Sequence, residues 1–420
     1  MPETAIYEHA GSLAGTGAVR EGSPADAVEG IVPRIVVEPA DSAAVGRILE
    51  WASREKLIVL TRGGGTKMGW GGAPARIDVL LSTARMNAVV AHRHGDLTAT
   101  IEAGATLAGV NRTLAQHRQW IPIDPLWAAT ATIGGLVATN DSGPRRHRYG
   151  APRDLIIGVE FARADGSLAK GGGIVVKNVA GYDLPRLLTG SFGCLGVIVT
   201  ATFKLYPLTA ASKTLVADVR KASDLGLLAG KIAASHLTPT ALEFNTHPLR
   251  LIIRFESIEA SVEKQSEAAA ALIGTAGLTA QTFSGQAEEQ LWLDQARLME
   301  DGRGTLVKVS VLPTQLAETL NVIEGLAGKD SYSAAGRAGA GVFFVRIDGD
   351  ETAQTRIISG LRDTLPIGMG SAVVVRGAAQ RRNQLDTWGP VGDGLALMKA
   401  VKKQFDPSGV LNPGRGPGGL

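Results

Sequence analysis

The chain has 420 residues, more than one ordinary globular domain, and 45% of them are hydrophobic while 20% are charged. This composition indicates a folded globular protein and excludes disordered, fibrous and coiled-coil classes. Lysine and arginine total 43 against 40 acidic residues, a formal net charge of +3, which is too balanced to indicate a nucleic-acid or lipid partner. The single cysteine, Cys194, excludes an intrachain disulfide and any cysteine-ligated cluster held by this chain alone.

The N-terminal segment is rich in serine, glycine, alanine, proline and acidic residues, with no basic stretch before an apolar core. It predicts a loose polar leader over residues 1–30 and not a secretory signal. The sequence also lacks a long, uncharged apolar stretch, so it predicts no transmembrane segment. We therefore expect a cytoplasmic protein.

Residues 31–208 predict a first domain that begins with a β-α-β unit. Asp41 marks the start of its helix, whose apolar residues recur on one face. A glycine-rich loop from Arg62 to Gly72 follows the second strand. The three strands are expected at 34–38, 57–60 and 78–81.

The same domain continues through further strands, a short helix and a hairpin turn. From Gly196 to Leu205 apolar and polar residues alternate, which predicts a strand with one buried face that ends at Pro207. The other expected elements are strands at 99–102 and 154–161, a helix within 106–118 and a turn at Asp165 and Gly166.

Residues 209–390 predict a second domain of different architecture. The pattern strand, helix, strand, strand, helix, strand runs from Lys213 to Phe283 and recurs from Thr305 to Arg376, with its weakest strand near Tyr332. Two such units predict a ferredoxin-like α+β domain. The remaining residues, 391–420, predict a helix to about Lys403 and a turn-rich tail.

Taken alone, the loop from Arg62 to Gly72 allows two interpretations. Backbone N–H groups without Cβ bulk can converge on a diphosphate, which favours an anion cradle. The spacing matches neither of the familiar dinucleotide-binding or P-loop motifs, so a flexible loop is an equal alternative.

Two further glycine-rich stretches favour the cradle. One runs from Asp124 and Pro125 to Gly143, and the other from Val176 to Gly196. Three such segments, each after an expected strand or turn, are hard to explain as independent linkers. We therefore expect them to form one extended ligand site.

At these residues the chain resembles the vanillyl-alcohol oxidase family, whose FAD-binding domain is of the PCMH type. The resemblance covers roughly residues 32–207. Within that family the sequence from Lys177 to Leu184, the chain length and the tail are most similar to the smaller FAD-binding subunits of glycolate oxidase. The resemblance implies an α+β fold: a two-part FAD-binding domain, then the ferredoxin-like domain as a cap, and a tail that returns to the FAD-binding domain.

The resemblance also implies which residues bind FAD. The first loop would surround the pyrophosphate with backbone amides, the second stretch would run along the pyrophosphate and flavin ring, and the third would face the dinucleotide. These expected FAD-binding residues are Arg62, Gly63, Gly64, Gly65, Thr66, Asp124, Pro125, Thr132, Ile133, Gly134, Gly135, Gly143, Tyr149, Gly150, Gly193, Gly196 and Val197.

The sequence departs from some relatives in how FAD would be held. Some family members attach FAD covalently through a histidine of the first loop, but Arg62 to Gly72 contains neither His nor Cys. We therefore expect non-covalent FAD. Cys194 is more consistent with a small packing residue than with an anchor.

A second departure concerns catalysis. Single-chain dehydrogenases of this family carry a histidine-rich metal site in their C-terminal half, whereas the last histidine here is His247. They also usually have an acidic residue where Phe192 stands. We expect no metal, and both differences favour a subunit that works with partners.

Other titratable residues allow both a functional and a purely structural interpretation. The segment from Arg145 to Arg148, which includes His147, would bind a carboxylate, a phosphate or an acidic partner, or would be a solvated basic loop. His92 and His94 lack a third ligand and are better read as surface residues. Tyr182 and Lys177 are the weak catalytic candidates, and Tyr182 is equally compatible with a core aromatic. The catalytic base is otherwise unknown.

The resemblance implies a function that follows from these features. The chain would be the FAD-binding subunit of a glycolate-oxidase-like complex that oxidises glycolate or a related 2-hydroxy acid to the 2-oxo acid. Electrons would pass to a second flavin subunit or an iron–sulfur subunit, and any membrane association would be peripheral, through those partners. The alternatives are a stand-alone, metal-free FAD oxidoreductase and a scaffold subunit without working flavin.

Overall fold

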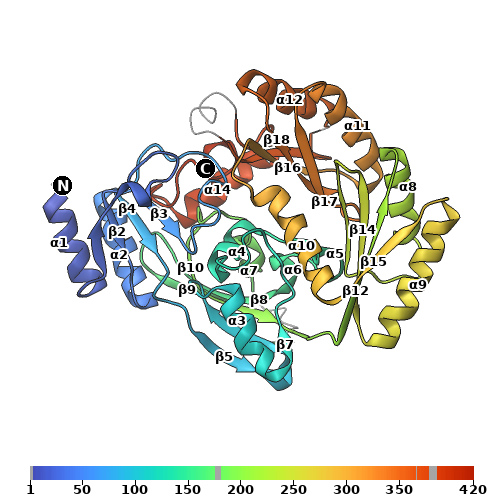
Figure 1. The fold of residues 1–420 in the computed structure, drawn as a ribbon. Coiled ribbons are helices and arrows are strands. Elements are labelled where there is room, and N and C mark those ends of the chain that lie inside the picture. The colour runs from blue at the N-terminus through green and yellow to red at the C-terminus, as the bar shows by residue number, and fades with distance from the viewer. Residues whose placement is uncertain (1–2, 176–180, 366, 378–385) are drawn as a thin grey trace. The chain divides into compact units, whose positions relative to one another are not determined.

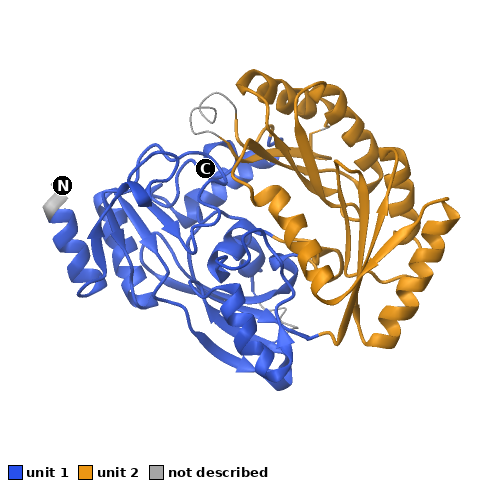
Figure 2. Cartoon of the chain, viewed as in Figure 1, with its two compact units in different colours: residues 1–141, 151–208, 391–420 blue, residues 142–150, 209–390 orange. Residues whose placement is uncertain are grey.

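The computed structural model of the chain describes residues 3–175, 181–365, 367–377 and 386–420. The described chain divides into two units, drawn in different colours in Figure 2. Unit 1 comprises residues 1–141, 151–208 and 391–420, and unit 2 comprises residues 142–150 and 209–390. Within the described ranges, no helix is both long enough and apolar enough to cross a membrane.

The first sheet of unit 1 has four strands in the order β1-β2-β4-β3. Strands β2 and β3 run parallel to β4, as the β-α-β prediction requires, whereas β1 is antiparallel to β2. Two helices pack beside this sheet (Figure 1). These elements are α1 (Glu3–Ala14), β1 (Val19–Glu21), β2 (Ile35–Val37), α2 (Ser42–Glu55), β3 (Val59–Arg62) and β4 (Val79–Ser82).

Helix α2 begins and ends where the sequence indicates. The Asp41 side chain accepts a hydrogen bond from the Ala44 amide, which satisfies a donor that the first helical turn leaves unpaired. The apolar residues between Val45 and Ala52 are buried on one face. Lys56 adopts the left-handed conformation that closes the helix.

The second sheet of unit 1 has five antiparallel strands in the order β5-β6-β10-β8-β9. Helices on this sheet bury a separate apolar core. Its strands are β5 (Val89–Arg93), β6 (Thr98–Glu102), β8 (Ile156–Ala162), β9 (Leu168–Gly172) and β10 (Val197–Lys204), and the helices in this part of the chain are α3 (Leu107–Leu114), α4 (Ile133–Thr139), α6 (Pro152–Leu155) and α7 (Leu184–Leu188). Strands β7 (Gln119–Trp120) and β11 (Tyr206–Pro207) pair with each other as a separate two-stranded sheet.

Strand β10 lies between the two cores of unit 1. Its pairing with β8 shifts register between Ile198 and Thr200, so Val199 packs in the core of the first sheet while Ala201 packs in the core of the second. The predicted strand is present, but Ile198 is buried as well, so the prediction of a single buried face was wrong.

The C-terminal segment returns to the first sheet. After helix α14 (Gly394–Phe405), Leu411 forms a parallel bridge with Val59 at the start of β3. The Lys402 ammonium donates hydrogen bonds to the carbonyls of Cys194 and Leu411 and forms an ion pair with Asp406. The prediction of a returning tail is therefore confirmed.

Unit 2 is built on one eight-stranded sheet, in the order β15-β12-β14-β13-β17-β18-β16-β19. Each half has the strand order of a ferredoxin-like unit, and the halves join where β13 pairs antiparallel with β17. The elements are β12 (Ala211–Asp218), α8 (Ala222–Ala233), β13 (Ala241–Asn245), β14 (Arg250–Ser257), α9 (Glu259–Thr275), β15 (Ala280–Phe283), α10 (Gly285–Glu300), β16 (Thr305–Ser310), α11 (Leu316–Ala327), β17 (Tyr332–Arg337), β18 (Val342–Ile347), α12 (Glu351–Thr364) and β19 (Ser371–Arg376).

The ferredoxin-like prediction is confirmed in both halves, including the weak strand at Tyr332. Helix α10 was not predicted. It joins the two halves, and the buried Glu288 on it accepts hydrogen bonds from the hydroxyls of Ser212 and Thr214.

A short segment within the expected first domain packs with unit 2 instead. Residues 142–150 contain helix α5 (Arg146–Tyr149). Arg145 forms a two-pronged hydrogen-bonded ion pair with the buried Glu256, at 2.8 and 3.0 Å. These contacts explain why the segment belongs with the sheet of unit 2 and not with its neighbours in the sequence.

The N-terminal residues are not a loose leader, which corrects the prediction. Helix α1 buries Ile6 and Ala10 completely, the Tyr7 hydroxyl donates a hydrogen bond to the Val19 carbonyl, and the His9 ring lies 5.3 Å from the Trp51 ring. Small alanine and glycine residues gave the segment a polar, low-complexity appearance, although one face of the helix is apolar.

Helix α1 should therefore contribute to stability. Replacing Ile6 by alanine (Ile6→Ala) is expected to lower the free energy of unfolding by about 2–4 kcal/mol, because it leaves a cavity in a packed core. Urea unfolding of the full chain measures the change. Glu8→Ala on the exposed face of the same helix should stay within about 0.5 kcal/mol of the wild type, and equal stability of both variants would show that the helix does not pack as described.

Candidate functional site

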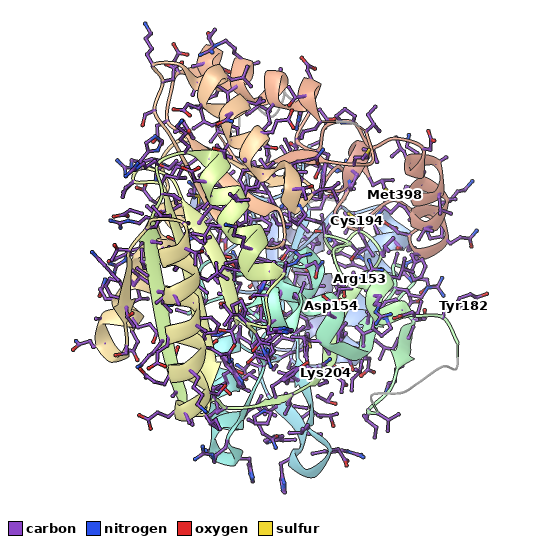
Figure 3. The ribbon with its side chains drawn as sticks, turned by 90° about the vertical axis from the view of Figure 1, so that its right-hand side faces the viewer. Arg153, Asp154, Tyr182, Cys194, Lys204 and Met398 are labelled. Carbon is purple, nitrogen blue, oxygen red and sulfur yellow. The ribbon has the colours of Figure 1, made fainter. Side chains whose placement is uncertain are left out.

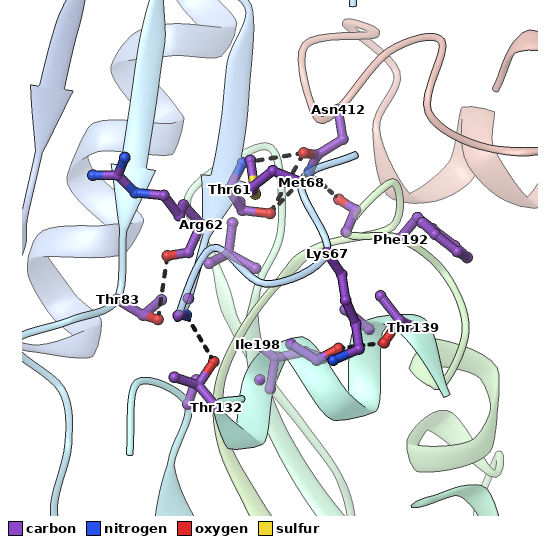
Figure 4. A pocket seen from close by; sticks show the side chains of 18 of the residues that line it. Thr61, Arg62, Lys67, Met68, Thr83, Thr132, Thr139, Phe192, Ile198 and Asn412 are labelled. Carbon is purple, nitrogen blue, oxygen red and sulfur yellow. Dashed lines mark hydrogen bonds between the residues drawn. The ribbon is translucent and has the colours of Figure 1, made fainter. Parts of the chain in front are cut away.

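The glycine loop and two other segments of unit 1 line one pocket. Strand β3 ends at Arg62, and the chain turns into the loop where the pocket opens (Figure 4). The backbone N–H groups of Gly63, Gly65 and Thr66 have no hydrogen-bond partner among the residues that the structure describes. Unpaired amides that line a pocket are suited to bind an anion.

Close packing and backbone conformation both require glycine in this loop. A Cβ on Gly63 would lie 2.1 Å from the Thr132 hydroxyl oxygen, and one on Gly64 would lie 1.9 Å from the Thr130 carbonyl oxygen. The Gly64 amide donates a hydrogen bond to the same Thr132 hydroxyl. Gly65 has φ = +75°, which a side chain would strain.

The charged side chains that line the pocket are basic. The side chains that line it include Arg62, Lys67 and Arg415 and no carboxylate. Arg62 is held by Asp26 at 3.0 Å, and hydrogen bonds from Arg20, with further ones from Ser23 and Arg62, keep the pKa of the Asp26 carboxyl well below its usual range. The wall therefore suits a ligand that carries negative charge.

The tail completes the wall from the far end of the sequence. The Asn412 side chain accepts a hydrogen bond from the Thr61 amide and donates one to the Gly193 carbonyl, as Figure 4 shows in part. Arg415 donates to the carbonyls of Gly72 and Met68. The tail thus fixes the first glycine loop to the loop before β10.

A second and larger cavity continues from the first. It has a volume of about 780 Å³ and shares Gly63, Gly64 and Thr132 with the first pocket. Its other walls come from Thr130 and from residues between 84 and 113, among them the polar residues Asn87 and Thr106. A volume of several hundred cubic ångströms is typical of sites for organic cofactors.

These features fit FAD. The unpaired loop amides and the ion-paired side chains of Arg62 and Lys67 line a pocket suited to a diphosphate, and the connected cavity offers room for an organic group on one side of it. Gly134 meets Ala103 so closely that a Cβ there would lie 2.8 Å from the Ala103 Cβ. A side chain at Gly134 would therefore disturb the packing of α4 against Ala103, next to the pocket.

The structure brings together many of the residues predicted from the sequence. Those that line the first pocket are Arg62, Gly63, Gly64, Gly65, Thr66, Thr132, Gly134, Gly135, Gly193, Gly196 and Val197.

Six other predicted FAD-binding residues do not line either pocket. Ile133 is fully buried in the core of the second sheet. Asp124 and Pro125 precede Leu126, whose carbonyl accepts a hydrogen bond from Lys67. Gly143, Tyr149 and Gly150 belong to unit 2.

Several pocket residues had no signal in the sequence analysis. Lys67 and Met68 follow Thr66 in the glycine loop, and Phe192 had been noted only as a departure from relatives. Asn412 and Arg415 lie more than two hundred residues further along the chain. Only the asparagine and glycine turns of the tail hinted that this segment was structured.

Cys194 is a packing residue and not an anchor in the pocket. Its side chain is buried, and burial raises the pKa of the thiol to about 11. Its Sγ lies 3.5 Å from the Asn412 carbonyl. The thiol therefore serves the contact between the tail and the loop before β10.

The structure does not place the catalytic candidates in the pocket. Tyr182 is 90% exposed, and its side chain points outward in Figure 3. The hypothesis that Tyr182 is an aromatic residue of the core is therefore wrong. Lys177 lies outside the described residues.

The basic segment is not a solvated loop throughout. Arg145 is engaged by Glu256, and burial lowers the pKa of His147. The rings of His92, His94 and His117 lie 4.5–6.1 Å apart in unit 1, yet no group of three or more His, Cys, Asp or Glu side chains in the described chain is arranged to hold a metal ion.

Two stretches of the chain match known protein families. Residues 33–172 match the family described as "FAD binding domain", and residues 377–415 match "FAD linked oxidases, C-terminal domain". The first match covers β2 to β9 and the glycine loop, and the second includes α14 and the tail to Arg415.

The chain is also similar to curated proteins over most of its length. It is 28% identical to the glycolate oxidase subunit GlcD of Bacillus subtilis, with 91% of this chain and 89% of that protein covered. It is 28% identical to a D-lactate dehydrogenase of Archaeoglobus fulgidus (91% and 90% covered) and 24% identical to a D-2-hydroxyglutarate dehydrogenase of Xanthomonas citri (91% and 89% covered).

Solved structures share the fold. p-Cresol methylhydroxylase with substrate bound matches with a TM-score of 0.77 at 16% identity, covering 98% of this chain and 96% of that chain. Alkyldihydroxyacetonephosphate synthase matches with a TM-score of 0.74 at 16% identity, covering 98% and 86%. Taken with the pocket, these matches show that the chain is an FAD-linked oxidoreductase whose fold is the PCMH-type FAD-binding fold and whose cofactor is FAD.

Proposed function

We propose that this chain is the FAD-binding subunit of a complex that oxidises glycolate or a related 2-hydroxy acid to the corresponding 2-oxo acid. The observation that carries the proposal is the pocket in unit 1, with unpaired loop amides and a cationic wall, in a chain whose relatives are named for 2-hydroxy acids. Bound FAD would supply the acceptor for the hydride equivalent from the hydroxyl-bearing carbon.

The residues of the chain have distinct parts in this proposal. The amides of Gly63, Gly65 and Thr66 bind the diphosphate, and Gly134 with Gly135 allows the flavin close to the second sheet. The tail holds these loops through Asn412. The other predicted FAD-binding residues, which do not line either pocket, stay part of the proposal: Asp124, Pro125, Ile133, Gly143, Tyr149 and Gly150.

Dependence on partners is supported by what the sequence lacks. One cysteine cannot ligate an iron–sulfur cluster, so electrons leaving the flavin would pass to a second flavin subunit or an iron–sulfur subunit. No histidine follows His247, so a histidine-rich metal site cannot form in the last 173 residues (420 − 247). Two alternatives, a stand-alone metal-free oxidoreductase and a flavin-free scaffold, are separated from the proposal by the experiments below.

The flavin is expected to be bound without a covalent bond, because the loop from Arg62 to Gly72 has neither His nor Cys and the Cys194 thiol is buried. Acid or heat denaturation of the purified yellow protein should release all flavin absorbance into the supernatant. Colour that stays with the precipitated chain would contradict this expectation, and a colourless protein with intact structure would favour the scaffold.

Close packing of the first loop should be required for FAD binding. Gly64→Ala places a Cβ where the Thr130 carbonyl lies, so the loop must shift, and the dissociation constant for FAD should rise about tenfold or more, which corresponds to about 1.4 kcal/mol. Gly95→Ala is the matched control, since no atom lies within 4 Å of its added Cβ. Flavin fluorescence titration of the stripped proteins measures both, and equal affinities would remove Gly64 from the site.

Anaerobic reduction tests the substrate and the role. Glycolate, D-lactate and D-2-hydroxyglutarate are added separately to the yellow protein alone and then to the protein with its co-expressed partners. We expect bleaching of the flavin band by one of the three acids only in the presence of partners. Full turnover by the chain alone would establish the stand-alone alternative, and no bleaching by any of these acids in either preparation would overturn the 2-hydroxy-acid proposal.

A further inference from the structure

Lys67 is a buried cation in the wall of the FAD pocket. It follows the glycines of the first loop, and its side chain is only 5% exposed. Lysine is rarely buried to this extent unless its charge is paired. Its place beside the unpaired loop amides therefore calls for a physical explanation.

The Lys67 ammonium connects three segments of unit 1. It donates hydrogen bonds to the Thr66 hydroxyl in its own loop, at 3.2 Å, and to the Leu126 carbonyl, at 3.3 Å. Its Nζ lies 3.2 Å from Asp141 Oδ2, just beyond the end of α4. These three segments are the first loop, the turn after Asp124 and the stretch that leads out of α4, and Figure 4 shows the side chain reaching from the loop toward α4.

The surroundings of the pair are buried and aromatic. The Nζ lies 5.7 Å from the centre of the Trp70 ring and 5.8 Å from that of Trp127, which favours a cation there. Asp141 is only 2% exposed, and its Oδ2 has no aligned hydrogen bond within the described residues, so the contact with Lys67 is an ion pair. The Asp141 carboxylate offsets part of the cost of burying a charged group at this place.

A buried ion pair by itself often adds little to the stability of the folded state. Removing two charges from water is costly, and apolar residues of similar volume often stabilise a protein as well or better. A paired charge with fixed partners does, however, restrict a loop to one position. The three anchored segments are those that line or lead to the FAD pocket, so a restriction there acts on the cofactor site.

We propose that Lys67 and Asp141 form a positioning pair that holds the first loop, the turn at Leu126 and the end of α4 in the arrangement that binds FAD. The proposal rests on FAD as the cofactor. Neither residue is assigned a part in the chemistry. Lys67 also lines the pocket, and the pair acts on FAD binding by holding the loop amides in place.

Three variants of the full chain separate positioning from stability. Lys67→Met removes the charge, Lys67→Arg keeps it, and Lys67→Met with Asp141→Leu removes both charges, so that no unpaired carboxylate stays buried if the single variant fails to fold. Each protein is stripped of flavin, its melting temperature is measured, and FAD is titrated by fluorescence quenching.

We expect Lys67→Met to raise the dissociation constant for FAD about tenfold or more. The double variant should melt near the wild-type temperature and still bind FAD at least about tenfold more weakly than the wild type. Lys67→Arg should bind FAD more tightly than Lys67→Met. The control is Arg346→Met, which removes a buried, ion-paired cation 3.0 Å from Asp348 in unit 2 and should lower the melting temperature without changing FAD affinity.

Two results would count against the proposal in different ways. Wild-type FAD affinity in the folded double variant would show that the pair has no positioning role, whatever its effect on melting. Failure of the wild-type chain to bind FAD at all would instead overturn the cofactor site on which the proposal rests.

Discussion

Close approach of backbone to backbone is the constraint on which the pocket of unit 1 depends. The first loop packs against the segment before α4 at distances that exclude a Cβ on Gly64, and it packs against the tail at Gly72, where a Cβ would lie 2.0 Å from the Gly414 carbonyl oxygen. A Cβ on Gly193 would meet the Asn412 amide at 2.6 Å. Glycine at these positions therefore lets distant parts of the chain share one wall, and the same absence of side chains leaves amides free for a ligand.

The sequence predicted the elements whose pattern is local. Helix α2 has its capping Asp41 and an apolar face, and both ferredoxin-like halves repeat the same strand and helix order, so periodicity was sufficient for them. Periodicity was not sufficient for α1, because the buried face of this helix consists largely of small residues, such as Ala10 and Ala14 beside Ile6. Nor could it show that β10 changes sides at a register shift, because both of its faces are buried.

The site was predictable to the extent that it is made of glycine. Gly63 to Gly65 and the pair Gly134 and Gly135 line the pocket. They could be predicted because close approach of the backbone requires glycine, and clusters of glycine are visible in a sequence. Asn412 and Lys67 left no such mark. Asn412 acts through hydrogen bonds to the backbone of segments far away in the sequence, and Lys67 differs from a solvated lysine only by its burial next to Asp141, which is a tertiary property.

The end of α4 gives the ion pair a second structural context within unit 1. Asp141 directly follows Asn140, which closes α4 in the left-handed conformation. The same helix carries Gly134 and Gly135, which line the pocket. The Asp141 carboxylate is therefore placed by the end of this helix as well as by its ion pair with Lys67. The aromatic and ionic contacts of Lys67 then carry that placement to the glycine loop.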